Sequence, residues 1–301
     1  MHKRYPQAIL VSCELPWDED QRLMEDAFRA QVLITLESFN HLYIFGTAGE
    51  GYALSQFKDI AGIFWEETDR PGVHPMVGVI AMSTALVVEK IAAAYDIGFR
   101  VFQITLPPWG ALTDDETLTF FKDVCGAFPD ASFLHYNTIH SKRLLYTEDY
   151  LRIEAEVPNL VATKFESASP TETRKLVTQT SLQHFLGEGN FPWGCLHGEC
   201  SLLAFTAPLS PASARRFFDL GVTGRVAELF RCAEEIDSVV EALYGPVTGL
   251  QLVDGAYDKI LARASGFEMP LRMLSPYAGC DMATYEACVA ALRDAHPDWL
   301  T

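Results

Sequence analysis

The sequence has no hydrophobic run long enough to cross a membrane, because no apolar stretch approaches the roughly 18 residues that a spanning helix needs. Basic residues are scarce, since 23 Lys and Arg stand against 40 Asp and Glu and leave a net charge of −17. Such a surface repels phosphate backbones and anionic lipids, so we expect neither a nucleic-acid partner nor a membrane partner. We also expect no secretory signal, because the apolar run after the basic start ends at Ser12.

The seven cysteines are odd in number and scattered, which does not suit a disulfide framework in a chain of 301 residues. We therefore expect reduced thiols and a cytoplasmic location. The span 195–200 holds two cysteines, a histidine and a glutamate, but the Pro-Cys-x-x-Cys partner that zinc deaminases use is missing. The sequence therefore predicts no metal site, and we expect no organic cofactor.

What the sequence does contain is an alternation of short β-rich runs with longer segments of helical period. We expect eight strands, at residues 8–12, 42–45, 76–80, 101–105, 132–135, 160–163, 183–186 and 201–204. Capping signals support the helices between them, such as Thr113 with Glu116, and Ser169 before Pro170. The pattern predicts an α/β fold, a (β/α)8 TIM barrel over residues 1–221, with an open doubly wound sheet as the competing arrangement.

After residue 221 the alternation stops, and residues 222–301 have the pattern of helices over 225–244, 250–264 and 282–295. No polar linker separates this part from the barrel. We expect a C-terminal helical extension that packs on the barrel as a cap or forms an oligomer interface, without a site of its own.

In a barrel of this kind the reacting groups lie at the C-terminal ends of the strands. The second predicted strand runs into Gly46-Thr47-Ala48-Gly49-Glu50-Gly51. Three glycines in six residues allow positive φ and let backbone N–H groups approach an anion closely. Taken alone, this run is as typical of a plain glycine-rich turn as of a binding loop.

Lys164 stands at the end of the sixth predicted strand. Burial lowers the pKa of a lysine, and the neutral amine is a nucleophile that forms a Schiff base with a ketone. In the structural alternative, Lys164 extends out of the barrel end or pairs with Glu166. Tyr136, on the neighbouring strand, favours the chemical interpretation, because Schiff-base chemistry needs a hydroxyl that moves protons. His135 points to the opposite face of that strand, so we expect it to be a packing histidine.

Together these segments resemble the dihydrodipicolinate synthase and N-acetylneuraminate lyase family of class I aldolases. The resemblance extends over essentially the whole chain and rests on Gly46-Thr47-x-Gly49-Glu50, Tyr136-Asn137, Lys164 at 28 residues after Tyr136, Gly187-Glu188 and the segment 198–211. It implies that Lys164 forms an imine with a 2-oxo acid. Tyr136 would then be the general acid and base, and the Thr47 hydroxyl would relay its protons.

The resemblance also implies a set of substrate-binding residues around that lysine. Backbone N–H groups of Thr47 and Ala48, next to Gly46, would hold the substrate carboxylate. The carbonyl of Leu203 would face the lysine, and Gly187 would end the seventh strand beside it. His140, in a loop at the barrel mouth, is a further candidate for contact with the substrate.

Three departures from the family pattern bear on the substrate. Ala48 stands where a second hydroxyl residue is usual, and the lost hydrogen bond to the carboxylate is worth about 1.5–3 kcal/mol. The segment 107–109 replaces one that supplies a tyrosine to a neighbouring subunit, and its Trp109 offers a flat apolar surface for a bulky substrate. The proline and arginine expected after Asn137 are missing, and Lys142 or Arg143 would replace that arginine only if the loop is shifted.

The sequence therefore predicts a Schiff-base-forming lyase or aldolase for pyruvate or another 2-oxo acid. We expect a homo-oligomer, a dimer or tetramer, and not a dihydrodipicolinate synthase. A hydratase-aldolase or dehydratase acting on a bulky or sugar-derived 2-oxo acid is one alternative. A catalytically inactive member with a binding or regulatory role is another, motivated by Ala48 and Trp109. A phosphate-binding barrel that uses residues 187–190 is the third.

Overall fold

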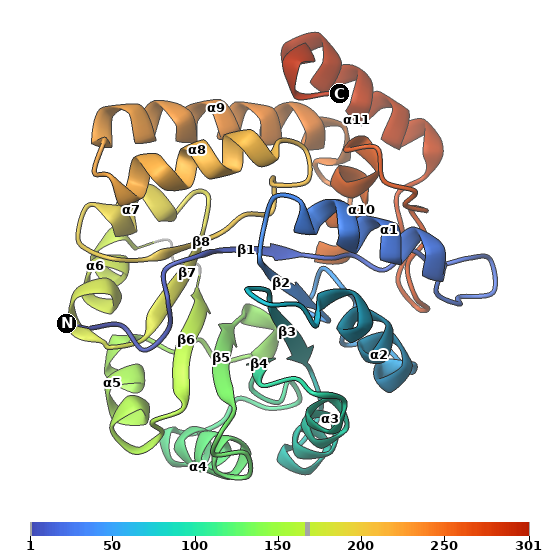
Figure 1. Ribbon diagram of the computed structural model, residues 1–301. Helices are drawn as coiled ribbons and strands as arrows, with labels where there is room; N and C mark the ends of the chain where they lie inside the picture. Colours follow the sequence, from blue (N-terminus) through green and yellow to red (C-terminus); the bar gives the residue numbers. More distant parts are fainter. Residues whose placement is uncertain (1, 166–168, 301) are drawn as a thin grey trace.

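Eight parallel strands close into a barrel in the computed structural model, which describes residues 2–165 and 169–300 (Figure 1). The strands are β1 (Ile9–Ser12), β2 (His41–Ile44), β3 (His74–Val79), β4 (Val101–Ile104), β5 (Ser132–Asn137), β6 (Leu160–Phe165), β7 (Gln183–Gly187) and β8 (Ser201–Leu203). Each strand pairs with the next along the chain, and β8 pairs with β1. The predicted (β/α)8 barrel is confirmed, and the open doubly wound sheet was the wrong alternative.

Helices follow the strands and surround them. They are α1 (Glu25–Leu36), α2 (Phe57–Thr68), α3 (Thr84–Ile97), α4 (Asp114–Gly126), the 3-10 turn η1 (Ile139–Ser141), α5 (Thr147–Glu156), α6 (Pro170–Gln179), α7 (Phe191–Cys195) and α8 (Pro211–Val222). Thr113 and Glu116 form the predicted capping box at the start of α4. Ser169 accepts the Glu172 N–H at the start of α6. These local signals were therefore reliable guides to where the helices begin.

Two apolar cores stabilise the barrel. The inner core fills the barrel itself and contains Tyr5, Ala8, Leu10, Tyr43, Met76, Leu134, Val161, Ala162, Phe185 and Leu203. The larger outer core lies between the strands and the surrounding helices and continues into the C-terminal helices. Because the barrel interior is filled by side chains, it holds a packed core and not a channel, and a ligand has room only at the barrel's ends.

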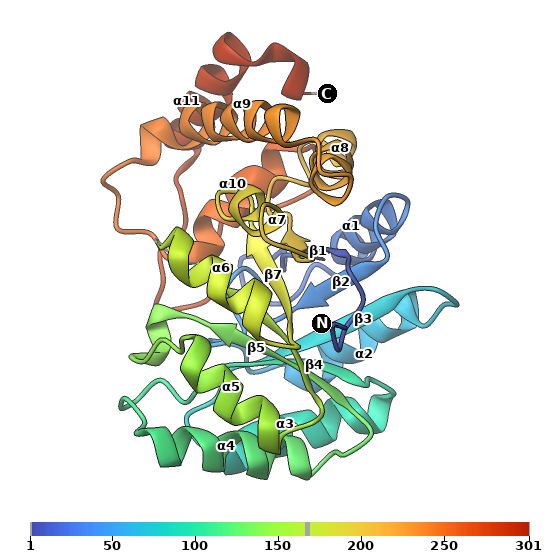
Figure 2. The same cartoon turned by 90° about the vertical axis from the view of Figure 1, so that its left-hand side faces the viewer.

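The C-terminal extension consists of α9 (Val226–Tyr244), η2 (Gly245–Val247), α10 (Asp254–Ala264), α11 (Met282–Ala295) and η3 (Pro297–Trp299). Figures 1 and 2 show α9 and α11 stacked beyond α8, on the side of the molecule opposite α3 and α4. Its helices share the outer core with the barrel. No helix in residues 2–165 or 169–300 combines the length and the apolar character that crossing a bilayer requires.

A bulge between β5 and β6 sets the direction of the side chains at the end of β6. Phe133 pairs with Leu160, but the next residue, Leu134, pairs with Ala162, so β6 gains one residue. From there the register continues to the pair Tyr136 and Lys164. Because side chains alternate along a strand, this extra residue turns Lys164 to the same side as Tyr136.

A buried ion pair joins the loop after β2 to the extension. Glu50 Oε1 lies 2.7 Å from Lys259 Nζ in α10, and both side chains are fully buried. Trp17 Nε1 donates to the same oxygen, and the backbone N–H of Leu274 donates to Glu50 Oε2, each at 2.7 Å. Burial lowers the pKa of Lys259, an effect that the charge of Glu50 opposes. The carboxylate is thus held by partners from three distant parts of the chain.

Replacing Lys259 by Met leaves the buried Glu50 carboxylate without its cation and should lower the free energy of unfolding by about 3–5 kcal/mol. Urea unfolding of the two proteins measures this difference. The exposed pair of Lys122 and Glu156 provides a control, because Lys122→Met should cost less than about 1 kcal/mol. Equal effects of the two substitutions would show that the buried pair has no special role.

Candidate active site

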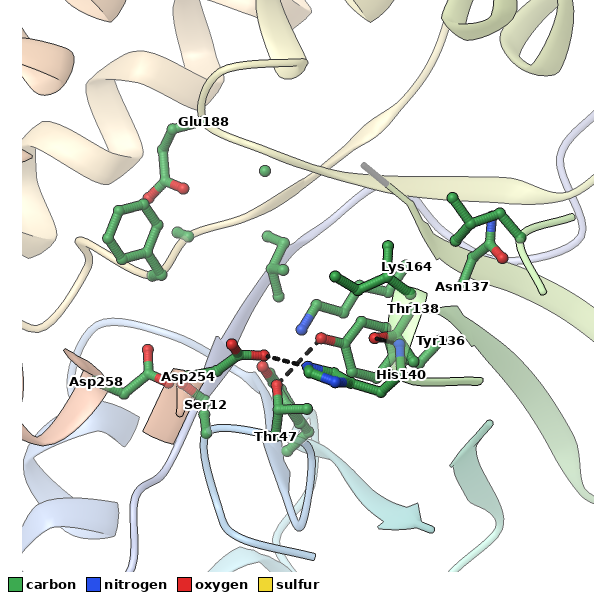
Figure 3. Close-up of a pocket in the computed structure, with 18 residues that line it drawn as sticks. Ser12, Thr47, Tyr136, Asn137, Thr138, His140, Lys164, Glu188, Asp254 and Asp258 are labelled. Atoms are coloured by element: carbon green, nitrogen blue, oxygen red, sulfur yellow. Dashed lines mark hydrogen bonds and ion pairs between the residues drawn. The ribbon is translucent and has the colours of Figure 1, made fainter. Parts of the chain in front are cut away.

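A cavity of about 340 Å³ lies at the C-terminal ends of the strands, and we name it the main cavity. Strand ends supply Ser12, Tyr43, Tyr136, Lys164, Gly187 and Leu203 to its lining. The loops after the strands add Thr47, Ala48 and His140, and α10 adds Asp254 and Asp258. Reacting groups of a barrel are expected at this end. Figure 3 shows Glu188 and Asp258 on one side of the main cavity and Tyr136 on the other, with the Lys164 amine between them.

Lys164 is buried in the lining of the main cavity and does not extend away from the barrel. Its side chain is 7% exposed, and its Nζ lies 3.8 Å from the centre of the Tyr136 ring and 5.8 Å from that of Tyr43. Glu166, the partner in the structural alternative, is outside the described residues. Its amine is therefore held in the lining of the main cavity, over the faces of two aromatic rings.

The Tyr136 hydroxyl is hydrogen-bonded to a second hydroxyl. Thr47 Oγ1 lies 3.1 Å from Tyr136 Oη, and either atom can be the donor (Figure 3). β5 supplies the tyrosine, and the loop after β2 supplies the threonine. Two hydroxyls in contact can pass a proton from one to the other, so the pair has the geometry of a short relay beside the amine.

The glycine-rich loop adopts a conformation that differs from the prediction. Positive φ angles occur at Phe45 and Glu50, not at the three glycines between and after them. The glycines are needed for space instead, because a Cβ on Gly51 would lie 2.2 Å from the Phe45 carbonyl oxygen. Gly46 lies against the Tyr43 ring and does not line the main cavity. The tight fold of the loop therefore places Thr47 and Ala48 at the barrel mouth.

Ala48 leaves backbone donors at the position where a hydroxyl was expected. In the described chain, the N–H groups of Thr47 and Ala48 donate to no protein acceptor. Both residues line the main cavity. Adjacent free N–H groups in a tight loop can bind an anionic oxygen, as the resemblance implies for a carboxylate.

Sequence reasoning missed several polar residues of the main cavity. Tyr43, within the predicted strand 42–45, lies close to Lys164, and burial raises the pKa of its phenol to about 12. Asp254 and Asp258 come from the extension, for which no site was expected. Burial raises the pKa of Asp258 well above its usual range, and the nearby charge of Glu14 adds to this effect. The sequence of α10 does not show that two of its aspartates pack near a lysine about ninety residues earlier in the chain.

Of the two side chains predicted to contact the substrate, His140 and Trp109, only His140 lies in the described lining of the main cavity. His140 lines the main cavity, and its Nε2 lies 3.4 Å from Asp254 Oδ2. Trp109 is 79% exposed and does not line the main cavity. Its indole is therefore exposed and forms no part of the described lining of the main cavity.

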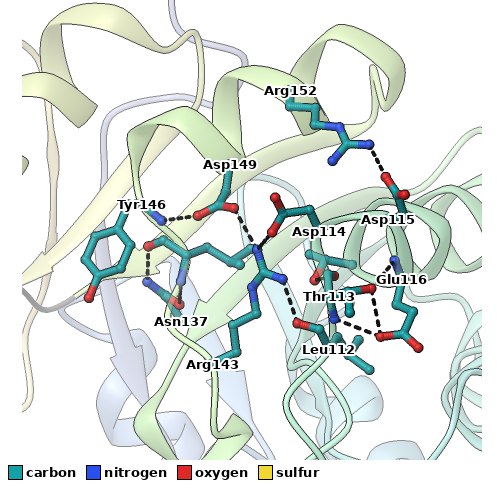
Figure 4. A network of polar contacts seen from close by, with 12 residues as sticks. Leu112, Thr113, Asp114, Asp115, Glu116, Asn137, Arg143, Tyr146, Asp149 and Arg152 are labelled. Carbon is teal, nitrogen blue, oxygen red and sulfur yellow. Dashed lines mark hydrogen bonds and ion pairs between the residues drawn. The ribbon is translucent and has the colours of Figure 1, made fainter.

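Lys142 and Arg143 are engaged outside the main cavity. Lys142 Nζ donates to the carbonyl of Trp109, at 3.1 Å. Arg143 donates to the Leu112 carbonyl and to carboxylates of Asp114 and Asp149, at 2.6–2.8 Å (Figure 4). Within the described lining of the main cavity, Lys164 is the only lysine or arginine. A phosphate-binding loop at residues 187–190 would therefore have Lys164 as its one lysine or arginine within that lining.

His135 has the packing role that its position in β5 predicted. Its ring is buried, and its Nδ1 lies 2.8 Å from the hydroxyl of Tyr150. Burial lowers the pKa of His135 to about 3, so the ring is neutral near pH 7. It belongs to the outer layer between β5 and the helices, and not to the site.

The fold and the site together define a class, the (β/α)8 barrels that carry a buried lysine beside a tyrosine at the barrel mouth. No family model matches the chain. The trans-O-hydroxybenzylidenepyruvate hydratase-aldolase of Pseudomonas putida is 25% identical over 150 residues, which cover 49% of this chain and 43% of that protein. The 4-hydroxy-tetrahydrodipicolinate synthase of Corynebacterium aurimucosum is 26% identical over 253 residues, 82% of each chain.

Solved structures share the fold over almost the whole chain. YagE from E. coli K12, a protein of the dihydrodipicolinic acid synthase family in complex with pyruvate, has a TM-score of 0.84 at 15% identity, over 96% of this chain and 98% of its own. CdNal from Clostridium difficile, in complex with mannosamine, has a TM-score of 0.83 at 16% identity, over 97% and 99%. At 15% and 16% identity these structures show the shared fold, and the two curated relatives, at 25% and 26% identity, support the resemblance to the dihydrodipicolinate synthase and N-acetylneuraminate lyase family.

The buried Glu14 carboxyl, which contacts the cavity-lining Ser12, leads to a prediction about pH. It is buried, and it accepts hydrogen bonds from Ser12 Oγ at 2.6 Å and Gln31 Nε2 at 2.7 Å. Burial raises the pKa of Glu14 to about 7, although these two hydrogen bonds act to lower it. Between about pH 4.5 and 7 the folded state therefore keeps a proton that the unfolded state has lost. The free energy of unfolding should fall by up to about 3 kcal/mol as the pH rises through this window.

Glu14→Gln should abolish that fall, which urea unfolding at a series of pH values measures. Glu116→Gln is the matched control, because the capping box lowers the pKa of Glu116 instead of raising it. An unchanged pH dependence in Glu14→Gln would mean that Glu14 is ionised throughout.

Proposed function

We propose that the protein is a Schiff-base-forming lyase or aldolase that acts on pyruvate or another 2-oxo acid. The observation that carries the proposal is the buried Lys164 amine beside Tyr136, whose hydroxyl contacts Thr47. The named activities of the two curated relatives, a hydratase-aldolase and a synthase, support a lyase of the class I aldolase type. The pyruvate complex of YagE supports a 2-oxo acid as the substrate.

In the proposed reaction the neutral Lys164 amine attacks the keto carbon of the 2-oxo acid. The C–N bond forms, the keto oxygen leaves as water after it gains protons, and a cationic imine remains. This imine accepts the electron pair that is released when the C3–C4 bond breaks. In the direction of synthesis, the same electron pair forms that bond to an aldehyde.

Tyr136 would move the protons that these steps require. During cleavage it takes the proton of the C4 hydroxyl as the aldehyde carbonyl forms, and during synthesis it returns that proton to the aldehyde oxygen. Thr47 Oγ1, at 3.1 Å, connects this hydroxyl to the barrel mouth. Backbone N–H groups of Thr47 and Ala48 would hold the carboxylate.

Dihydrodipicolinate synthase activity is disfavoured within the proposal. Its aldehyde substrate carries a carboxylate, for which the family uses an arginine after the tyrosine-asparagine pair. Here Arg143 is bound by Asp114 and Asp149, and Lys142 contacts Trp109. Hydratase-aldolase or dehydratase chemistry on a bulkier 2-oxo acid begins from the same imine and remains the alternative. We also propose a homo-oligomer, although one solved neighbour is described as a monomeric dihydrodipicolinate synthase variant.

Incubation with pyruvate and then borohydride should add one reduced pyruvate imine to Lys164, because reduction makes the C–N bond permanent. Peptide mass spectrometry of the labelled protein locates the adduct. Lys164→Met should abolish labelling, and Lys122→Met, which removes an exposed lysine, should not. A folded protein that no 2-oxo acid labels at Lys164 would be a member without turnover, and the proposal would fall.

Tyr136→Phe should lower turnover by about 100-fold or more, because it removes the general acid and base. Pyruvate binding, measured by calorimetry, should change much less. Tyr146→Phe is the matched control, since Tyr146 is exposed at the start of α5. An unchanged rate in Tyr136→Phe would remove this residue from the mechanism.

A further inference from the structure

Two cysteines that the proposed function does not use lie in contact with each other. Cys195 ends α7, Cys200 directly precedes β8, and their Sγ atoms are 3.6 Å apart. Because a disulfide bond is about 2.05 Å long, the two sulfurs need to approach by only about 1.5 Å to form one. The fold therefore brings these two thiols to the distance at which a small movement joins them.

Cys195 differs from the other six cysteines in its exposure. Those six are buried, and Cys195 alone is partly exposed. An oxidant dissolved in water therefore reaches Cys195 first, and the thiol that lies next to the oxidised sulfur is that of Cys200. An accessible thiol with a second cysteine beside it is the arrangement that redox-sensitive pairs use.

Two glycines make room for the pair of sulfurs. A Cβ on Gly194, in α7, would lie 2.8 Å from Cys200 Sγ, and a Cβ on Gly221, in α8, would lie 2.7 Å from Cys195 Sγ. Each sulfur therefore occupies space that a larger residue at the glycine would fill. Because α7 packs against α8 (Figure 1), this packing keeps the two sulfurs side by side.

The chain around the two cysteines can follow the approach of the sulfurs. Residues 196–199 are exposed and belong to no helix or strand. The start of β8 is held in place, because Gln7 Nε2 donates to the Cys200 carbonyl at 2.9 Å and Ser201 Oγ accepts the Ala8 N–H at 3.0 Å. We therefore expect the short helix α7 to move towards Cys200, with the exposed segment absorbing the change.

The two thiols have different electrostatic surroundings. The hydrogen bond to Cys195 and burial raise the pKa of Cys200 well above its usual range, although the charge of Lys3 acts to lower it. Cys200 therefore remains a thiol near neutral pH and is a poor target for the oxidant itself. Its contact with Cys195 gives it a high effective concentration towards an oxidised sulfur at that position.

We propose that Cys195 and Cys200 are a site of reversible oxidation, at which a peroxide converts two thiols into one disulfide bond while the protein stays folded. The inference uses neither Lys164 nor Tyr136, so it stands apart from the proposed function. It is consistent with the reduced thiols expected from the sequence, because the disulfide forms only when the oxidant is present.

The oxidation takes place in two steps, written here for hydrogen peroxide. The thiolate form of Cys195 attacks one peroxide oxygen, the O–O bond breaks, hydroxide leaves, and Cys195 becomes a sulfenic acid. The Cys200 sulfur then attacks the sulfenic sulfur, the S–O bond breaks, and the departing hydroxide takes the Cys200 proton as water. In total two thiols and one peroxide give one disulfide and two waters, and two electrons pass from the sulfurs to the peroxide. A dithiol reductant returns both thiols by exchange.

The test treats the folded protein with hydrogen peroxide and then counts thiols after denaturation. The count should fall from seven per chain to five, and dithiothreitol should restore seven. Glu199 lies between the two cysteines, so proteolysis after this residue, once free thiols are blocked with iodoacetamide, places them on separate peptides. These peptides should stay joined in the oxidised sample and separate on reduction. A count that stays at seven, or a loss of thiols without joined peptides, would overturn the inference.

Two serine variants locate the reaction. Cys195→Ser, at the partly exposed position, should keep all six of its thiols under the same treatment. Cys280→Ser is the matched control, because Cys280, at 8% exposed, is the most exposed of the six buried cysteines. Its thiol count should fall from six to four, since the pair is intact. Loss of two thiols from Cys195→Ser, or none from Cys280→Ser, would contradict the assignment.

A third variant tests the order of the two steps. In Cys200→Ala no neighbouring thiol removes the sulfenic acid, so dimedone, which traps sulfenic acids, should label Cys195 several-fold more than in the wild-type protein. Equal labelling of the two proteins would mean that Cys200 does not react with the oxidised Cys195, and the inference would be wrong. Circular dichroism confirms that each variant is folded. If Cys200→Ala does not fold, the thiol counts of the wild-type protein and of Cys195→Ser still decide the question.

Discussion

The buried ion pair between Glu50 and Lys259 is the constraint on which the geometry of the site depends. Glu50 belongs to the loop that carries Thr47 and has a left-handed backbone, a conformation that surrounding contacts must stabilise. Lys259 belongs to α10, which forms another wall of the main cavity. One contact of 2.7 Å therefore fixes the barrel loop and the extension relative to each other. The extension is thus part of the site, although it contributes no group to the proposed proton relay.

The barrel could be predicted because strand and helix periods are local properties of the sequence. Lys164 and Tyr136 could be found because their strand ends and spacing are also visible there. The wall of the main cavity formed by α10 could not be predicted, because Asp254 and Asp258 reach the site only through the packing of that helix. Tyr43 was hidden for a different reason: a tyrosine inside an apolar strand has the same pattern whether its hydroxyl is in a core or faces a ligand.

The ionisable groups of the main cavity bear on both substrate binding and imine formation. Carboxyl groups of Glu188, Asp254 and Asp258 line it, and Lys164 is the one lysine or arginine in the described lining. In the proposed mechanism a neutral amine is needed for attack, and a full positive charge appears only with the imine. That charge then arises in a buried site, where fixed charges act more strongly than in water.

Because of the bulge in β6, the presence of Lys164 and Tyr136 in the sequence is not enough to form the site; the strand register must also bring them to the same side. The extra residue between Leu160 and Ala162 determines which way Lys164 faces. A chain that kept every residue of the relay but lost this one position would direct the amine into the apolar layer under the helices. In this chain, a single-codon deletion upstream of the lysine would therefore remove the amine from the site as replacement of the lysine does, while a comparison of motifs would still find every residue in place.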